Sequence, residues 1–136
     1  MMQRSLFGLF LLAVFIGSCD KDKKADCSNI FCTQEFRIIT ILINHASDSS
    51  AFILTDYKVI RLSDNKDITH LNNIIPENSG YYPLVDDSDS KLLRNINVEI
   101  EFQGYMGNNI IIRKRFIVTA DCCHVALVSG ESVIYI

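Results

Sequence analysis

Alternation of apolar and polar residues is clearest in the second half of the chain. Residues 98–103 read Val-Glu-Ile-Glu-Phe-Gln, so every second side chain is apolar. This period of two predicts a strand that is buried on one face. Residues 110–118 form another strand-like run, and the glycine-containing residues 104–109 between the two runs predict a hairpin turn.

Further apolar runs predict the remaining strands. Residues 36–43 are apolar on both parities, which predicts a central strand covered on both faces. Polar residues are interspersed in residues 52–62, and residues 81–85 form a short run. Residues 125–128 and 133–136 flank a Ser-Gly pair and predict a closing hairpin, whose last strand would anchor the end of the chain in the sheet.

The polar breaks between these runs have the residues of turns. Residues 63–67 are a turn cluster, and Pro76 argues against a central strand in residues 68–78. The acidic residues 86–90 predict a cap for one helical turn that runs through residue 94. No long segment with a helical period separates the strands. We therefore expect an all-β fold, an immunoglobulin-like two-sheet β-sandwich of about seven strands, with a small barrel as the alternative.

The charges on the predicted hairpin suggest its register. We expect Glu101 to face Arg113 and Glu99 to face Arg115, which places opposite charges on one solvent-facing side. Lys114 falls on the apolar side, so we expect it to lie near the rim, where its ammonium group reaches water.

The composition is that of one small folded domain. The chain has 136 residues, of which 49% are hydrophobic, with two prolines and no tryptophan. Thirteen basic against sixteen acidic residues give a formal charge of −3. This balance argues against a nucleic-acid-binding protein, because such proteins normally carry a basic face.

The N-terminus has the organisation of an export signal. Arg4 precedes an apolar stretch at residues 6–16, and the sequence Ile-Gly-Ser-Cys then ends at Cys19. The apolar stretch is about half the roughly 20 residues that a membrane-spanning helix needs, and it has the length of a signal-peptide core. Together these features resemble the signal peptide and lipobox of bacterial lipoproteins.

The resemblance implies that Cys19 carries a diacylglyceryl group and that cleavage removes residues 1–18. Charged residues then form a solvated tether. Lys21-Asp22 partially matches the outer-membrane signals of lipoproteins in Bacteroidota, whereas an acidic residue at the position of Asp20 favours inner-membrane retention in enterobacterial lipoproteins. We expect a lipid anchor in the outer membrane, with the protein on its periplasmic or surface face.

This reading divides the chain into three parts. Residues 1–18 are the signal peptide, residues 19–32 are the lipidated cysteine and tether, and residues 33–136 are the β-sandwich domain.

Four cysteines remain beyond the lipidated one, at positions 27, 32, 122 and 123. Exported proteins meet an oxidising environment in which disulfides persist. Adjacent side chains of an extended chain point to opposite faces, so Cys122 and Cys123 suit two different partners. We expect two disulfides, Cys32 with Cys122 and Cys27 with Cys123, although the crossed pairing closes loops of nearly equal length.

The alternative is a metal-binding or redox-active envelope protein. The cysteines and His124 offer soft ligands that zinc or copper(I) favours, and Cys122, Cys123 and His124 form the candidate metal set. The spacing matches no standard zinc pattern, and neighbours on a strand do not easily converge on one ion. A histidine at this place is more often a polar residue on a sheet face.

Catalytic patterns are missing from the sequence. The three histidines, His45, His70 and His124, lie in separate segments, and residues 128–132 lack the leading glycine of a nucleophile elbow. The acidic residues 86–89 offer oxygen ligands for calcium, but they lack the glycine and the distant glutamate of an EF-hand loop. We expect a solvated acidic turn there.

Paired carboxylates are a further candidate site. Asp87 and Asp89 together with Glu99 and Glu101 would give paired carboxylates. The outer face of the predicted hairpin explains the two glutamates better.

We therefore expect no enzyme and no cofactor. The predicted function is that of a lipid-anchored, non-catalytic interaction or accessory module of the cell envelope. Its partner, besides the membrane that holds the lipid, would be an envelope protein or a glycan. If the partner is a glycan, tyrosine rings would stack on its sugars. The candidate rings are those of Tyr57, Tyr81, Tyr82 and Tyr105.

Overall fold

The computed structural model describes residues 26–70, 75 and 77–136. Among these residues the elements are β1 (Ile38–Asn44), β2 (Asp56–Arg61), β3 (Lys66–Asp67), β4 (Tyr81–Asp86), the 3-10 turn η1 (Asp87–Asp89), α1 (Ser90–Leu93), β5 (Val98–Met106), β6 (Asn109–Ala120), β7 (Val125–Ser129) and β8 (Val133–Tyr135). The expected signal peptide, the lipidated Cys19 and most of the charged tether lie outside the described residues.

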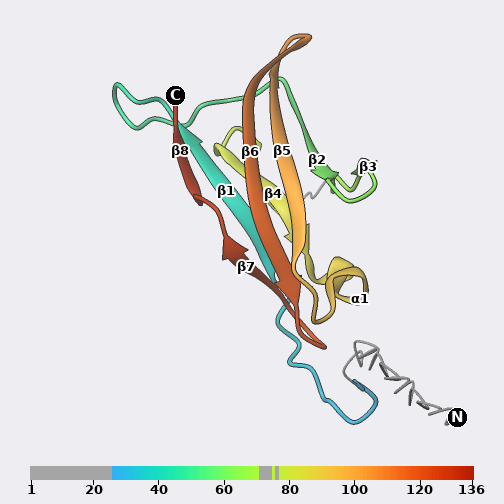
Figure 1. The fold of residues 1–136 in the computed structure, drawn as a ribbon. Helices are drawn as coiled ribbons and strands as arrows, with labels where there is room; N and C mark the ends of the chain where they lie inside the picture. Colours follow the sequence, from blue (N-terminus) through green and yellow to red (C-terminus); the bar gives the residue numbers. More distant parts are fainter. Residues whose placement is uncertain (1–25, 71–74, 76) are drawn as a thin grey trace, which may run out of the picture.

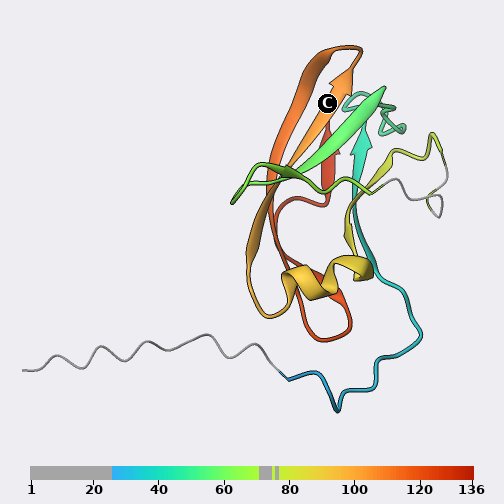
Figure 2. The ribbon, with the colours of Figure 1, turned by 90° about the vertical axis from the view of Figure 1, so that its right-hand side faces the viewer.

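The strands form a two-layered sandwich (Figure 1). In the described part of the chain, the smaller sheet has three strands in the order β4-β1-β8, and the larger sheet has five in the order β3-β2-β5-β6-β7. Figure 2 shows the layers from the side, with η1 and α1 lying across one end. The predicted all-β, two-sheet sandwich is confirmed, with eight strands rather than about seven in the described residues.

The core consists of apolar side chains that the two sheets direct toward each other. In β5, Val98, Ile100 and Phe102 are buried and Glu99 is exposed, as the alternation predicts. The prediction that residues 36–43 form a central strand is confirmed, since β1 lies between β4 and β8. The predicted cover on both faces is wrong, because Ile41 and Ile43 face the core and are buried, whereas Leu42 on the outer face is only half-buried. The largest fully buried side chains come from both layers and from α1, namely Phe102, Phe116, Ile41, Ile43, Leu84, Leu93, Ile100, Val59, Val85, Val118 and Val125.

The β5–β6 hairpin is confirmed, but its expected register is wrong by two residues. Glu101 lies opposite Arg115, and Gln103 lies opposite Arg113. A tight turn at Gly107 and Asn108 accounts for one residue of the offset, and a bulge between Gly104 and Tyr105 accounts for the other. An even offset keeps every side chain on its predicted face, since side chains alternate with period two.

The charged residues of this hairpin consequently share one solvent-facing side, as predicted. Glu101 bonds Arg113 diagonally at 2.7 Å, and its carboxylate lies 3.9 Å from Arg115. Lys114 is exposed and reaches Glu131 at 3.1 Å, which confirms the prediction that it lies at the rim.

The expected closing hairpin does not form. β7 pairs with β6 in the larger sheet, whereas β8 pairs in parallel with β1 in the smaller sheet. The chain crosses between the layers at Gly130, whose φ is +129° and whose α-carbon faces the Phe116 ring so closely that a Cβ would lie 2.2 Å from Cδ1. The last strand is nevertheless anchored, because Ile136 N–H donates to Asn44 O at 3.0 Å.

The structure also bears out the predictions for three shorter segments. Residues 81–85 form most of β4, and Pro83 is tolerated there because β4 is an edge strand. The predicted turn at residues 63–67 is present, and its last two residues form the short strand β3, which pairs with β2. The described part of residues 68–78 contains no strand, while Pro76 itself lies outside the described residues.

No helix among the described residues is long and apolar enough to cross a membrane.

The sandwich has two ends that differ in what they carry (Figure 1). We call the end with residues 26–37, residues 121–124 and the η1–α1 turn the basal end. The distal end carries the β5–β6 turn and the C-terminal residues, together with the start of β2 and the start of β4.

Candidate functional site

The acidic turn that follows β4 is a capped helical start. Asp86 is the N-cap of η1, and its Oδ1 accepts hydrogen bonds from the backbone N–H of Ser88 at 2.8 Å and from the Ser88 hydroxyl. The carboxylate of Asp89 in return accepts from the Asp86 N–H at 3.2 Å. This reciprocal arrangement is a capping box, and it confirms the predicted cap.

The prediction of a solvated acidic turn is wrong. Asp86 is only 6% exposed and Asp89 only 8%, and the side chain of Asp87 is 10% exposed. Each carboxylate has partners that replace water, as buried charges require. Asp86 caps the turn itself, whereas Asp87 and Asp89 link the turn to other segments of the chain.

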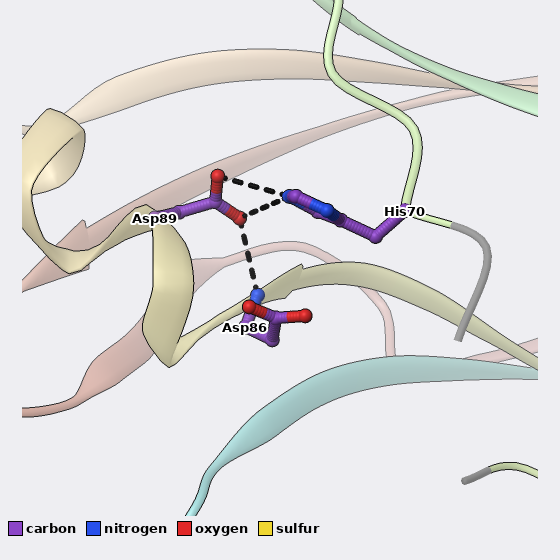
Figure 3. Close-up of side chains that lie close together, drawn as sticks. All are labelled: His70, Asp86 and Asp89. Carbon is purple, nitrogen blue, oxygen red and sulfur yellow. Dashed lines mark hydrogen bonds and ion pairs between the residues drawn. The ribbon is translucent and has the colours of Figure 1, made fainter. Parts of the chain in front are cut away.

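Asp89 holds His70. The ring Nε2 of His70 lies 3.0 Å from Oδ1 and 2.9 Å from Oδ2 of Asp89, so Nε2–H is shared between both oxygens. Figure 3 shows these side chains pointing toward each other, with the Asp86 carboxylate beside them. The backbone near His70 is fixed independently, because its carbonyl accepts from the Tyr57 hydroxyl at 2.8 Å and the Thr69 hydroxyl accepts from Val59 N–H at 2.8 Å.

Asp87 holds His124 on the other side of the turn. Its Oδ2 lies 2.8 Å from Nδ1 of His124, and the same carboxylate accepts from the backbone N–H groups of Arg37 at 2.8 Å and Val125 at 2.9 Å. Burial opposes ionisation of Asp87, but the hydrogen bonds from Arg37, His124 and Val125 outweigh it and hold its pKa below the usual value.

His124 has a second partner in the N-terminal segment. Its Nε2 lies 2.9 Å from the Thr33 hydroxyl, and in the tautomer whose Nδ1 donates to Asp87, Nε2 accepts from that hydroxyl. A local turn places the ring, because Asp121 Oδ1 accepts from the N–H groups of Cys123 and His124, both at 2.7 Å. These two hydrogen bonds also lower the pKa of Asp121.

Thr33, His124 and Asp87 thus form a hydroxyl–imidazole–carboxylate chain, the order found in hydrolase triads. The chemistry of a triad also needs donors for an oxyanion. Here the backbone N–H groups of Arg37 and Val125 donate to Asp87 itself, so they stabilise the carboxylate and not a charge at Thr33. The arrangement acts as a clasp that fixes residues 33–37 to the basal end.

Disulfides reinforce this clasp. Cys27 is bonded to Cys122 and Cys32 to Cys123, with Cα atoms 5.6 Å and 5.4 Å apart. The expectation that each N-terminal cysteine bridges to one member of the adjacent pair is confirmed. The choice of Cys32 with Cys122 is wrong, because Thr33 binds His124 and so places Cys32 beside Cys123.

The alternative metal set does not form. The sulfurs of Cys122 and Cys123 are both in disulfides, and disulfide sulfur offers no thiolate. Both ring nitrogens of His124 are occupied by Thr33 and Asp87. His124 also precedes β7 and does not stand on the face of a strand.

The paired carboxylates weighed from the sequence are engaged separately. Asp87 and Asp89 bind the two histidines, whereas Glu101 accepts from Gln103 and from Arg113, both at 2.7 Å. The hydrogen bond from Gln103, and then the one from Arg113, lower the pKa of Glu101 although burial opposes them.

Three of the four tyrosines considered for sugar stacking meet at the distal end. Tyr57, Tyr81 and Tyr82 line an open hollow of about 590 Å³ between the starts of β2 and β4, and Tyr105 is not among its lining residues. The hydroxyls of Tyr57 and Tyr82 donate to backbone carbonyls, and burial raises the pKa of Tyr57 to about 12. Tyr81 presents its ring, since the residue is 48% exposed.

Sequence reasoning missed both histidine–carboxylate contacts. His70 and Asp89 are 19 residues apart, and Asp87 and His124 are 37 apart. Neither pair therefore forms a local motif that could be recognised in the sequence. The one available signal was the density of carboxylates in residues 86–89, which marks the turn but not its partners.

Comparisons of the chain with protein-family models, with curated proteins and with solved structures found no match.

Proposed function

We propose that this chain is a lipid-anchored β-sandwich lipoprotein of the bacterial outer membrane, which acts as a non-catalytic interaction or accessory module. The observation that carries the proposal is the pair of disulfides at the basal end. Such bonds persist in oxidising compartments, which agrees with export of the protein. They also fasten the chain to the sandwich at Cys27, soon after the proposed lipid site Cys19.

This fastening supports one orientation on the membrane. Between the bridged Cys27 and Cys32, Ile30 is 51% exposed and Phe31 is fully exposed. Phe36, also in the basal segment, is 52% exposed. Aromatic and aliphatic side chains close to a lipid anchor are favourably placed at the membrane interface. The basal end would therefore face the bilayer, and the distal end would face away from it.

A distal end that faces away from the membrane is the part accessible to a partner. The hollow there combines the exposed ring of Tyr81 with hydrogen-bonding groups on Asp56, Glu77 and Asn78. A few polar groups around an aromatic surface are typical of binding sites for small ligands. A glycan of the envelope is the partner that suits this combination, and an envelope protein is the alternative.

The anchor is tested by replacing the acylated residue. The chain is expressed in a bacterium of the Bacteroidota, and membrane-extracted protein is examined by mass spectrometry of its N-terminal peptide. We expect an acylated Cys19 and cleavage before it, and we expect Cys19→Ala to leave uncleaved or soluble protein. Ser18→Ala, which keeps a small residue before the cysteine, is the matched control. An unmodified Cys19 in membrane-extracted protein contradicts the proposal.

A further inference from the structure

His70, Asp86 and Asp89 bring three potential metal ligands together near the basal end (Figure 3). One ligand atom from each side chain lies within 4.8 Å of the others, and the residues come from the segment after β3, the end of β4 and η1. We infer that these side chains form a site for a divalent transition-metal ion, with Zn²⁺ as the best fit. This inference does not depend on the lipid anchor.

The donor set matches zinc in type and in scale. Zinc is bound by imidazole nitrogen and carboxylate oxygen at about 2.0–2.2 Å, which places the ligands of a tetrahedral site about 3.3 Å apart. His70 Nε2 already lies 2.9 Å and 3.0 Å from the two oxygens of Asp89. An ion would take the place of the shared proton after a small separation of these groups. Calcium fits less well, because it takes six to eight oxygen ligands and no imidazole.

Hydrogen bonds from Ser88 and from the backbone of Asp86 orient the carboxylates of the cluster. Asp86 Oδ1 accepts from the backbone and hydroxyl of Ser88, and Asp89 accepts from the Asp86 N–H. Outer hydrogen bonds of this kind hold the ligands of protein metal sites in position. The capping box thus supports the helical turn and also sets the directions of two ligands.

The charge at the cluster also favours a cation. Asp86 and Asp89 are both buried, at 6% and 8% exposure. Arg61 is close enough to interact electrostatically with Asp89, but its guanidinium is bound to both oxygens of Asp64, at 2.8 Å and 2.6 Å. Buried carboxylates are stabilised by a metal ion or by another paired cation. A bound divalent ion would balance the two carboxylates directly.

The site is open on one side. The His70 side chain is 34% exposed, whereas that of Asp89 is 10% exposed. An ion held by these three ligands would therefore complete its tetrahedron with a water molecule that enters beside His70, as in zinc sites that keep an open position.

The test measures metal binding by the full-length chain, purified in detergent with its disulfides intact and stripped with a chelator. Zinc is titrated calorimetrically, and cobalt is titrated by its visible absorption, which reports the coordination geometry. We expect one ion per chain. His70→Gln should weaken zinc binding by about a hundredfold or more, since loss of a ligand exceeds the loss of an outer hydrogen bond. Asp89→Asn should weaken it in the same direction.

His45→Gln is the matched control, because the His45 ring packs against Phe52 at the distal end and lies outside the cluster. It should bind zinc as the unchanged chain does. Circular dichroism and a count of free thiols establish that each variant is folded and bridged. Zinc binding that is absent, or that survives both His70→Gln and Asp89→Asn in folded protein, overturns the inference. Loss of binding on His45→Gln would show adventitious binding and overturns it equally.

Discussion

Nδ1 of His124 lies 2.8 Å from Oδ2 of Asp87, and this contact joins the turn before β7 to the turn after β4. The other ring nitrogen of His124 holds Thr33, so a single imidazole connects three segments of the basal end. The adjacent Cys123 is bonded to Cys32, which precedes Thr33. Noncovalent and covalent links thus lie side by side at the same place.

The first prediction concerns acid stability. Because the pKa of Asp87 is depressed in the folded protein, its ionised form stabilises the fold at pH values above its unfolded value of about 3.9. This contribution is lost as the pH falls through the folded pKa. Asp87→Asn should cost about 1–3 kcal/mol at pH 7, since the amide NH₂ cannot accept from a backbone N–H, and less at pH 3, which lies below the unfolded pKa. Urea denaturation at both pH values measures this, with the surface variant Glu77→Gln as control. An equal cost at both pH values would show that the charge of Asp87 is unimportant.

The disulfide connectivity gives a second prediction, which paired variants can check. Cys27→Ser with Cys122→Ser removes one bridge and should leave no free thiol among the remaining basal cysteines. Cys27→Ser with Cys123→Ser breaks both bridges and should leave Cys32 and Cys122 as free thiols. Thiol titration without reductant distinguishes these outcomes. Four free thiols among Cys27, Cys32, Cys122 and Cys123 in the unchanged protein would contradict the disulfides and favour the alternative of a redox-active protein.

Loss of either bridge should lower stability considerably. The bridges span 95 and 91 residues, for which the loop-entropy model gives about 4.6 kcal/mol each as an upper figure. Reduction of both should lower the free energy of unfolding by several kcal/mol and leave the strand signal in circular dichroism, because the sheets have their own apolar core. A reduced protein that is fully unfolded in water would show that the core is weaker than we expect.

Gly130 should be the least replaceable glycine of the two that we compare. Gly130→Ala places a Cβ against the Phe116 ring at a φ of +129°, and it should cost about 2–4 kcal/mol. Gly107→Ala has nothing within 4 Å of its Cβ, so only its φ of +59° opposes it, at about 1 kcal/mol. Thermal unfolding ranks the two variants. The reverse order would mean that the Phe116 ring moves aside at little cost.

The charged face of the β5–β6 hairpin should contribute little. The Arg113 side chain is 54% exposed and that of Glu101 13%, so solvent screens the pair from the Arg113 side, and pairs at a surface are worth about 0–1 kcal/mol. A double-mutant cycle with Glu101→Gln and Arg113→Gln should give a coupling energy in that range that shrinks in 1 M salt. A coupling above about 2 kcal/mol would contradict this description of the face.

The proposed membrane orientation can be followed with a fluorescent reporter. The chain has no tryptophan, so Phe31→Trp supplies one reporter at the basal end. In acylated protein reconstituted into vesicles, its emission should shift to the blue and be quenched by brominated lipids. Tyr135→Trp, at a 59% exposed position on the distal end, should show neither effect. Equal quenching of both variants would contradict the orientation without bearing on the anchor itself.

Local patterns predicted the strands well, and long-range pairing poorly. The alternation of apolar and polar residues correctly predicted β5, and the apolar run at residues 81–85 correctly predicted β4, where an edge position tolerates Pro83. Both predictions depend only on residues that are neighbours in the sequence. The closing hairpin failed because the Ser-Gly pair resembles a hairpin turn, although Gly130 instead lets the chain pass Phe116 on its way to the other sheet. The partner of β8 is β1, and nothing in residues 133–136 specifies a strand so distant in sequence.

The candidate site shows the same limit in another form. Residues 86–89 announced a capped turn, since capping depends on spacing within four residues. The packing of the two sheets brings the histidine partners of these carboxylates into contact with them. Local sequence does not reveal this contact, so the carboxylates were expected to face solvent. The cysteines fall between these cases. Alternation of adjacent side chains correctly implied two partners, but the order of pairing depends on the contact between Thr33 and His124.

The parallel pairing of β1 with β8 bears on the order in which the chain would fold during the export that we propose. A chain that crosses a membrane with its N-terminus first releases β1 long before residues 133–136 emerge. Until then one edge of β1 is unpaired, and the apolar residues Ile41 and Ile43 lack part of their cover. Contacts between segments so far apart form slowly. On the proposed export route, the domain would therefore complete its smaller sheet only at the end of translocation, and the emerging chain would suit a chaperone that shields open strand edges.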